Sequence, residues 1–485
     1  MPQYKLRVAI VLAAFIGLMS GLIFVAYEPV APIAKDATNP LYFTYKGSPL
    51  YLVGHQNFRP NVTQATGRDM EAIMDVEGDL DKYLDYLAER NMNNIRLWPY
   101  FTGDPSNPVQ GYSDPPVWQR TGPGTGNDGL LKYDLTLLNQ EYFDRVSEIC
   151  AKAEDRDIII TILFWDVYGM QGNRWTNNPL NPDNNINNID ADSNNNGRGL
   201  DGFLDSPRSG AATAIQTAFE EKMIDTVNPY PNVIYELINE YAELDLPEAV
   251  ITRAAAYEAG KDQQHMIMLS TGGLADNGTY PHDFDKTEML ASSADVLTVA
   301  PGASGWGTVD TTPPLASRQG ANRPLVADMD HIDAGLRDNA YFWRVFTRGY
   351  HYVLYESAAP YVDLGWEGYM TDATEDLHRQ NMSYAGSLAN TRFENLSNMI
   401  PDDGTSVADT TFVMADVADE YLVFSPLSSR FDVKQLLNAT NYDFEWFNLA
   451  TGTVVSTGSI LTSGTTHTFS PPGTEYVLYL RRQGL

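Results

Sequence analysis

The sequence predicts an α/β fold: a (β/α)8 barrel of eight parallel strands wrapped by helices, followed by an all-β sandwich. The chain has 485 residues, which exceeds one ordinary domain and suits a barrel with an appendage. Short apolar runs alternate with helical segments over most of its length, as expected of a parallel sheet. Beyond about residue 409 the pattern changes to short period-two segments separated by turns, which is typical of a sandwich.

Eight apolar runs are predicted barrel strands, and the segments between them have the amphipathic pattern of helices. Asp79 is available as an N-cap, and Pro247 suits the first position of a helix. We place the barrel at 40–400 and the sandwich at 409–485, where no catalytic constellation is visible. The predicted strands are 50–53, 94–98, 158–164, 233–238, 266–269, 296–299, 325–327 and 352–355, and the main helices are 80–89, 141–153, 212–224, 247–259, 341–348 and 375–399.

The first 27 residues predict export. Lys5 and Arg7 precede an uncharged run, 8–27, of about twenty residues, which is long enough to cross a bilayer. A cleaved signal peptide and an uncleaved membrane anchor both fit this segment, and a Pro-containing linker follows at 28–39. Either way, we expect the rest of the chain to be extracytoplasmic, secreted or anchored to the membrane.

Acidic residues outnumber basic ones 63 to 32, which gives a formal net charge of −31. Such a surface repels phosphate backbones, so nucleic acid is excluded as a partner. Hydrophobic residues make up 43% of the chain, enough for a sizeable core. Cys150 is the only cysteine, so an intrachain disulfide cannot form.

The run 231–241, PNVIYELINEY, is the centre of the functional prediction. It predicts a buried strand with Asn239 and Glu240 at its carboxyl end, which is the end where parallel barrels build active sites. Glu236, on the same face as Glu240, needs a polar partner inside the barrel. The alternative is that Glu240 is a surface acid after a structural strand.

Hydrolysis of a glycosidic bond needs two carboxyl groups, one that donates a proton and one that attacks or activates water. The seventh strand offers the second, because Asp328 and Asp330 are two residues apart and share a face in extended chain. One of them is the predicted partner acid, and the other positions His331 or a sugar hydroxyl. A structural role for both, as a helix cap, is the alternative.

Other strand ends supply expected substrate-binding residues. Arg96 could hold an ionised carboxylate with a bidentate pair, and Trp98 follows it on the same face. Trp165 and Trp306 follow the third and sixth strands, where indole rings can stack on sugar rings or simply fill the core. Glu356 ends the eighth strand and is a third candidate acid.

Two insertions, 103–131 and 177–202, are rich in Gly, Pro, Asp or Asn, and we expect loops over the catalytic face. In the second, Asp192, Asn194, Asn196 and a glycine have the spacing of a calcium-binding loop. Phe203 stands where such loops carry a bidentate Glu. A structural calcium ion and an ion-free Asn-rich loop therefore both remain open, and no cofactor is required for catalysis.

The stretch Tyr235–Glu240 resembles the fourth-strand motif of the cellulase-like (β/α)8 glycoside hydrolases of the large retaining clan. Further stretches, 94–98, 120–129, 133–135 with 142–145, 184–187 and 328–331, resemble a narrower bacterial group whose barrel precedes a β-sandwich named for collagen binding, and 446–452 and 476–480 resemble that sandwich. The resemblance spans 41–482. It implies that Glu240 is the acid/base, that the nucleophile lies within 328–330, and that Arg120 belongs to the substrate site. This chain departs from the clan in having Tyr241 after the Asn-Glu pair and Asp at the nucleophile position.

We therefore expect an exported glycoside hydrolase acting on a polysaccharide or glycan. One alternative is a catalytically inactive surface protein that binds carbohydrate or adheres through its sandwich. Another is a metal-dependent hydrolase with Asp328, Asp330, His331 and Glu356 as ligands, which the absence of paired histidine motifs disfavours.

Overall fold

The structure is a computed structural model that describes residues 30–58, 79–98, 113, 115–192, 194–199, 210–239, 245–270, 286–299, 322–329, 338–354, 373–402, 407–408 and 412–485. The predicted segment 1–27 lies outside these residues. No helix of the described part is long and apolar enough to cross a membrane.

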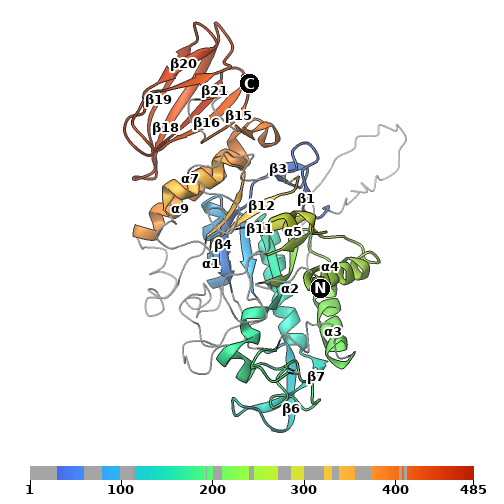
Figure 1. Ribbon diagram of the computed structural model, residues 1–485. Coiled ribbons are helices and arrows are strands. Elements are labelled where there is room, and N and C mark those ends of the chain that lie inside the picture. Colours follow the sequence, from blue (N-terminus) through green and yellow to red (C-terminus); the bar gives the residue numbers. More distant parts are fainter. Residues whose placement is uncertain are drawn as a thin grey trace, which may run out of the picture.

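Eight parallel strands close into a barrel, which confirms the predicted fold class (Figure 1). Their order around the barrel follows the chain, so β9 is the fourth strand and β12 the seventh. The strands are β4 (Val53–Phe58), β5 (Asn94–Leu97), β8 (Ile159–Asp166), β9 (Val233–Asn239), β10 (Ile267–Leu269), β11 (Val296–Val299), β12 (Leu325–Asp328) and β13 (His351–Leu354). The first strand lies later than predicted, since residues 48–50 belong to another sheet.

Helices cover the outside of the barrel. They are α1 (Asp79–Glu89), α2 (Gln140–Glu154), α3 (Gly210–Val227), α4 (Asp245–Glu258), α5 (Lys286–Ala291), α7 (Asn339–Thr347) and α9 (Ala373–Ser387). Pro247 falls in the first turn of α4, two residues inside its start. The predicted helix 375–399 ends early, because a π-helical turn follows at Leu388–Arg392.

A small antiparallel sheet, β1 (Ala34–Lys35), β2 (Phe43–Tyr45) and β3 (Ser48–Leu50), closes the amino end of the barrel. Ile33, Phe43 and Tyr45 pack there against inward-facing residues near the starts of the barrel strands, including Ile159 and Ile234. Part of the predicted linker is thus ordered as a strand. This apolar plug leaves the carboxyl ends of the strands as the place for a polar site.

The first insertion contains an antiparallel hairpin, which corrects the prediction of a loop throughout. Its strands are β6 (Trp118–Thr125) and β7 (Leu131–Leu138). It follows the second barrel strand and lies at the end of the molecule away from the terminal β sheets (Figure 1). Trp118, Tyr133 and Leu135 are buried and supply the small core that composition alone does not suggest.

The second insertion is irregular but ordered by asparagine side chains. The Asn185 amide donates to the carbonyls of Pro179, Asn181 and Ile189, and its oxygen accepts from Ile189 N. A parallel bridge joins Asn185 to Tyr133, so the loop is fastened to the hairpin. Side-chain amides replace the missing backbone ladder, because each provides two donors and an acceptor.

The carboxyl end of the chain is all-β, as predicted. A six-stranded antiparallel sheet faces a two-stranded one across a core that includes Trp446, Phe431 and Phe469. Four strands of this region are not among those predicted: β14 (Ile400–Pro401), β17 (Phe431–Lys434), β19 (Thr453–Leu461) and β20 (Thr466–Phe469). The larger sheet comprises β14 (Ile400–Pro401), β15 (Val413–Asp416), β16 (Glu420–Ser425), β21 (Tyr476–Arg482), β18 (Asn441–Asn448) and β19 (Thr453–Leu461); the smaller one pairs β17 (Phe431–Lys434) with β20 (Thr466–Phe469).

This β region packs firmly on the last barrel helices. The rings of Tyr384 on α9 and Phe447 on β18 stack with centroids 4.0 Å apart, and Asn381 donates to the carbonyl of Leu449 over 3.1 Å. Apolar residues of the large sheet, such as Val477, belong to the same buried cluster as the barrel helices. The barrel and the large sheet therefore share one continuous apolar interface.

Candidate active site

A buried ion pair lies inside the barrel below the carboxyl end of β9. Arg96 donates to both carboxylate oxygens of Glu236, from Nε over 2.7 Å and from Nη2 over 2.6 Å. The side chains are 2% and 0% exposed. Arg96 is therefore the buried polar partner that Glu236 needs, and the two fixed, parallel hydrogen bonds hold the guanidinium plane in one orientation.

The same guanidinium positions the end of the fourth strand. Arg96 Nη2 also donates to Asn239 Oδ1 over 2.8 Å and to Ser270 Oγ over 3.0 Å. Because the Asn239 oxygen accepts from Arg96, its amide orientation is fixed. Within the described residues, Asn239 Nδ2 is buried and has no hydrogen-bond partner. A buried amide donor without a partner is costly, and a ligand hydroxyl would satisfy it.

Ser270 and Thr298 extend the polar network, and the sequence prediction missed both. Ser270 Oγ donates to Glu236 Oε1, and Thr298 Oγ1 donates to Ser270 Oγ over 3.2 Å. Ser270 directly follows β10, and Thr298 lies on β11. Their position at or near the ends of the fifth and sixth strands could have indicated that they belong to the site. A single hydroxyl in an apolar run is common, however, so this signal is weak.

Of the predicted substrate-binding tryptophans, Trp98 and Trp165 lie within the described residues, and both are buried. The Arg96 guanidinium lies 5.3 Å from the Trp98 ring centroid, so Trp98 belongs to this network. Trp165 is 0% exposed; its Nε1 donates to Glu220 of α3 over 2.9 Å, and its ring packs on Phe219. Of the two roles open to Trp165, sugar platform or core residue, these contacts favour the core.

Arg120 serves the hairpin in this structure. It forms an ion pair with Asp128 and stacks on the Tyr133 ring at 3.8 Å, and it donates to the carbonyl of Leu131 over 2.8 Å. These contacts tie β6 to β7. They give Arg120 a structural role, so its predicted part in substrate binding stays a prediction.

The acids of the predicted catalytic pair lie at the limits of the described structure. Asp328 is the last residue of β12 and is in backbone register with Val353 of β13. Glu240 follows Asn239 in the chain but lies outside the described residues, as do Trp306, Asp330, His331 and Glu356. The roles of these residues remain predictions.

The predicted calcium loop forms a compact turn. Asp192 accepts from Asn196 N and Gly197 N, each over 2.9 Å, and Asn194 accepts from Asn196 N over 3.0 Å. These bonds stabilise the turn, and calcium stays a prediction. In the described part of the chain, no three His, Cys, Asp or Glu residues gather as a metal site.

Comparison with known proteins places this fold among glycoside hydrolases. Residues 107–276 match the family model "domain of unknown function DUF6298". No curated protein matches the chain. A solved glycoside hydrolase is similar with 13% identity and a TM-score of 0.55, over 94% of this chain and 98% of that one. A glycoside hydrolase family 5 structure from Bacteroides vulgatus ATCC 8482 is similar with 13% identity and a TM-score of 0.58, over 94% and 93%.

The fold is therefore a (β/α)8 barrel with an appended β region, similar to the folds of these solved glycoside hydrolases. The matched family segment runs from before β6 to beyond β10, so it includes the hairpin, the asparagine-rich loop and the Asn239 strand end.

Proposed function

We propose that the protein is an exported glycoside hydrolase that cleaves O-glycosidic bonds of a polysaccharide or glycan. The observation that supports this most strongly is the Arg96–Glu236–Asn239 network at the carboxyl end of the fourth strand. It fixes the residue immediately before Glu240 with two buried charges, and it leaves a buried amide donor for a ligand. A surface acid after a structural strand would need none of this support.

In the proposed reaction, Glu240 donates a proton to the leaving oxygen, and Asp328, or else Asp330, is the partner acid. Asn239 donates from Nδ2 to a sugar hydroxyl beside the reacting carbon. If the two carboxyl groups approach to about 5 Å, the partner attacks carbon and configuration is retained; at about 6.5–9.5 Å a water molecule fits between and configuration inverts. NMR of the first anomer released separates the two courses.

The test is a panel of polysaccharides, with hydrolysis measured as the release of reducing sugar. We expect Glu240→Gln to fold normally and to lose activity by several orders of magnitude. Glu89→Gln is the control, because Glu89 is an exposed acid at the end of α1. Full activity in Glu240→Gln would refute the assignment. Hydrolysis should also persist in a chelator, since two carboxyl groups suffice for this chemistry.

An inactive carbohydrate-binding or adhesive protein predicts a different result. It would bind glycan unchanged when Glu240 and Asp328 are both neutralised, and it would release no sugar from any substrate. Export is tested separately, because removal of residues 1–27 should leave the protein inside the cytoplasm. Fractionation of the full-length protein then separates a secreted form from a membrane-anchored one.

A further inference from the structure

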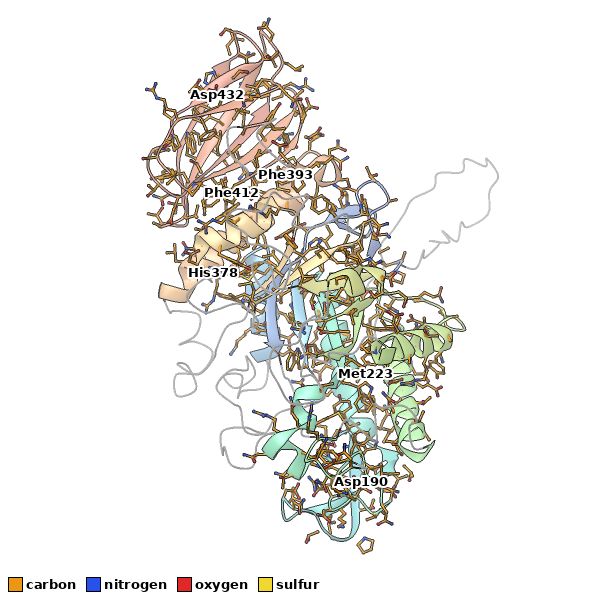
Figure 2. The ribbon with its side chains drawn as sticks, in the orientation of Figure 1. Asp190, Met223, His378, Phe393, Phe412 and Asp432 are labelled. Carbon is orange, nitrogen blue, oxygen red and sulfur yellow. The ribbon has the colours of Figure 1, made fainter. Side chains whose placement is uncertain are left out.

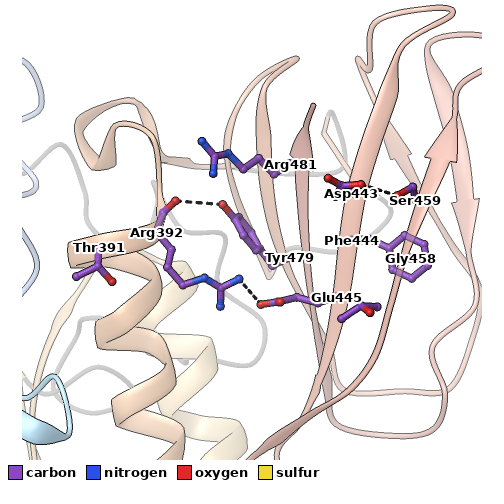
Figure 3. Close-up of a pocket in the computed structure, with 10 residues that line it drawn as sticks. Thr391, Arg392, Asp443, Phe444, Glu445, Gly458, Ser459, Tyr479 and Arg481 are labelled. Atoms are coloured by element: carbon purple, nitrogen blue, oxygen red, sulfur yellow. Dashed lines mark hydrogen bonds and ion pairs between the residues drawn. The ribbon is translucent and has the colours of Figure 1, made fainter. Parts of the chain in front are cut away.

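A polar pocket of about 560 Å³ lies between the large terminal sheet and the end of the last barrel helix (Figure 3). One wall is the π-helical turn Leu388–Arg392 that follows α9, with Thr391 and Arg392. The other wall is formed by one face of three adjacent strands, β19, β18 and β21. The volume lies within the range of ordinary ligand pockets.

Strand register explains why this face is polar. Asp443 pairs with Ser459 on one side and Arg481 on the other, and Glu445 pairs with Thr457 and Tyr479 in the same way. Residues paired in register point to the same face of a sheet. Six polar side chains therefore form a grid of two rows, while the intervening Phe444 and Trp446 contribute rings to the buried cluster between the two sheets.

The grid is held in place by the protein itself. Arg392 forms a 2.6 Å ion pair with Glu445, and its guanidinium carbon lies 5.1 Å from the Tyr479 ring centroid. Arg481 donates to Glu394 over 2.7 Å, and Asp443 accepts from Gln483 over 2.7 Å. A ligand would meet side chains that are already ordered, so little conformational entropy is lost on binding.

The lining carries two arginines, Arg392 and Arg481, and two acids, Asp443 and Glu445, so it has no excess of either charge. Arg481 is already paired with Glu394, and the chain has a net charge of −31, so the pocket has no surplus positive charge that would select an anionic ligand. The grid presents acceptors on Asp443 and Glu445, donors on Arg481, the hydroxyl of Thr457, which can do both, and the hydroxyl of Ser459, which donates to Asp443 and can accept from a ligand. Closely spaced donors and acceptors without net charge suit a ligand rich in hydroxyl groups.

We propose that this pocket is a second, non-catalytic binding site for a neutral glycan. It goes beyond the hydrolase proposal, because binding here does not depend on Glu240 or Asp328. The site lies on the face of the β region that packs beside α9, so it would hold a polymer next to the barrel.

The test uses the full chain carrying Glu240→Gln and electrophoresis in gels containing hydroxyethyl-cellulose, galactomannan or xyloglucan, with polygalacturonate as the anionic comparison. We expect retardation by at least one neutral polymer and none by polygalacturonate. Asp443→Ala should weaken that retardation at least about tenfold, since it removes a charged hydrogen-bonding group.

Asp432→Ala is the matched control. Asp432 lies on the other sheet (Figure 2) and accepts from the Thr468 hydroxyl across an antiparallel pair, as Asp443 does from Ser459 (Figure 3). The control should bind as the parent does. No retardation by any neutral polymer, equal binding by Asp443→Ala, or preference for polygalacturonate would each overturn the proposal. Sugar release by the proteins with Glu240 intact tests hydrolysis independently, and Asp443→Ala should leave it unchanged on a short soluble substrate.

Discussion

Arg96 and Glu236 share two hydrogen bonds, although β8 lies between their strands. The pair crosses the barrel interior instead of linking neighbours, so it fixes β5 and β9 relative to each other. The carboxylate also accepts from Ser270 of the fifth strand's end. A single guanidinium thus holds three strand ends at the site.

Loss of one partner from this pair should be severely destabilising. Arg96→Met leaves the Glu236 carboxylate buried without its counter-charge, and we expect a loss of about 3–5 kcal/mol in the free energy of unfolding. Urea denaturation followed by fluorescence measures it.

The double variant Arg96→Met, Glu236→Met is the informative control. It removes both charges, so we expect it to be more stable than either single variant. It should still fail to hydrolyse substrate, because Asn239 loses the donor that orients its amide. If the loss in the free energy of unfolding of the double variant equalled the sum of the losses of the two single variants, the two charges would not depend on each other.

The partner acid can be assigned by two substitutions on the seventh strand. Asp328 ends β12, at the edge where barrel enzymes place their catalytic groups. We expect Asp328→Asn to reduce the rate of hydrolysis by several orders of magnitude and Asp330→Asn to reduce it less. Initial rates on the best substrate of the panel measure both. The reverse order would move the assignment to Asp330.

The barrel was predictable because each strand is a short apolar run that needs burial on both faces. The same pattern identified Asn239 and the need of Glu236 for a partner, since a charge inside such a run must be compensated. Sequence alone did not show that Arg96, 140 residues earlier, is that partner. The pairing depends on which side chains meet inside the closed barrel.

The insertions were less predictable, for a physical reason. Their polar composition contains no periodic apolar stripe, so it suggests disorder or loops. The structure instead orders the second insertion through specific amide hydrogen bonds and the first through a hairpin with a few buried aromatic residues. The environment of Trp165 was also not predictable. Whether its indole faces a groove or a helix depends on how α3 packs against it.

The asparagine network gives a direct stability prediction. The Asn185 amide nitrogen donates to three carbonyl oxygens, so Asn185→Asp replaces this donor with a carboxylate oxygen that faces three acceptors, while the other oxygen can still accept from Ile189 N. We expect a loss of about 2 kcal/mol or more, confined largely to the loop. Limited proteolysis with peptide mapping should then show new cleavage within 172–199. Asn195→Asp is the control, because Asn195 is exposed and we expect little effect there; equal sensitivity of both variants would contradict a specific role for Asn185.

A buried histidine on α9, His378, which faces Tyr352 of β13, makes the stability of the fold depend on pH. His378 lies between Asn339 Oδ1, at 2.8 Å from Nδ1, and the Tyr352 hydroxyl, at 3.1 Å from Nε2. Burial, with the nearby Arg379 charge, lowers the pKa of His378 to about 4. The unfolded chain therefore binds a proton near pH 6.5 that the folded chain does not take up until about pH 4. As the pH is lowered from about 6.5 to about 4, the free energy of unfolding therefore decreases.

We expect His378→Gln, which does not titrate, to remove this part of the pH dependence. Below about pH 6.5, the stability of the parent should fall relative to that of the variant by about 1.4 kcal/mol per pH unit. His55, whose pKa burial lowers to about 3, is present in both proteins and largely cancels in the comparison. Urea midpoints at pH 7.0, 6.0 and 5.0 provide the measurement. Parallel curves for the two proteins would mean that His378 becomes protonated in the fold as readily as in the unfolded chain.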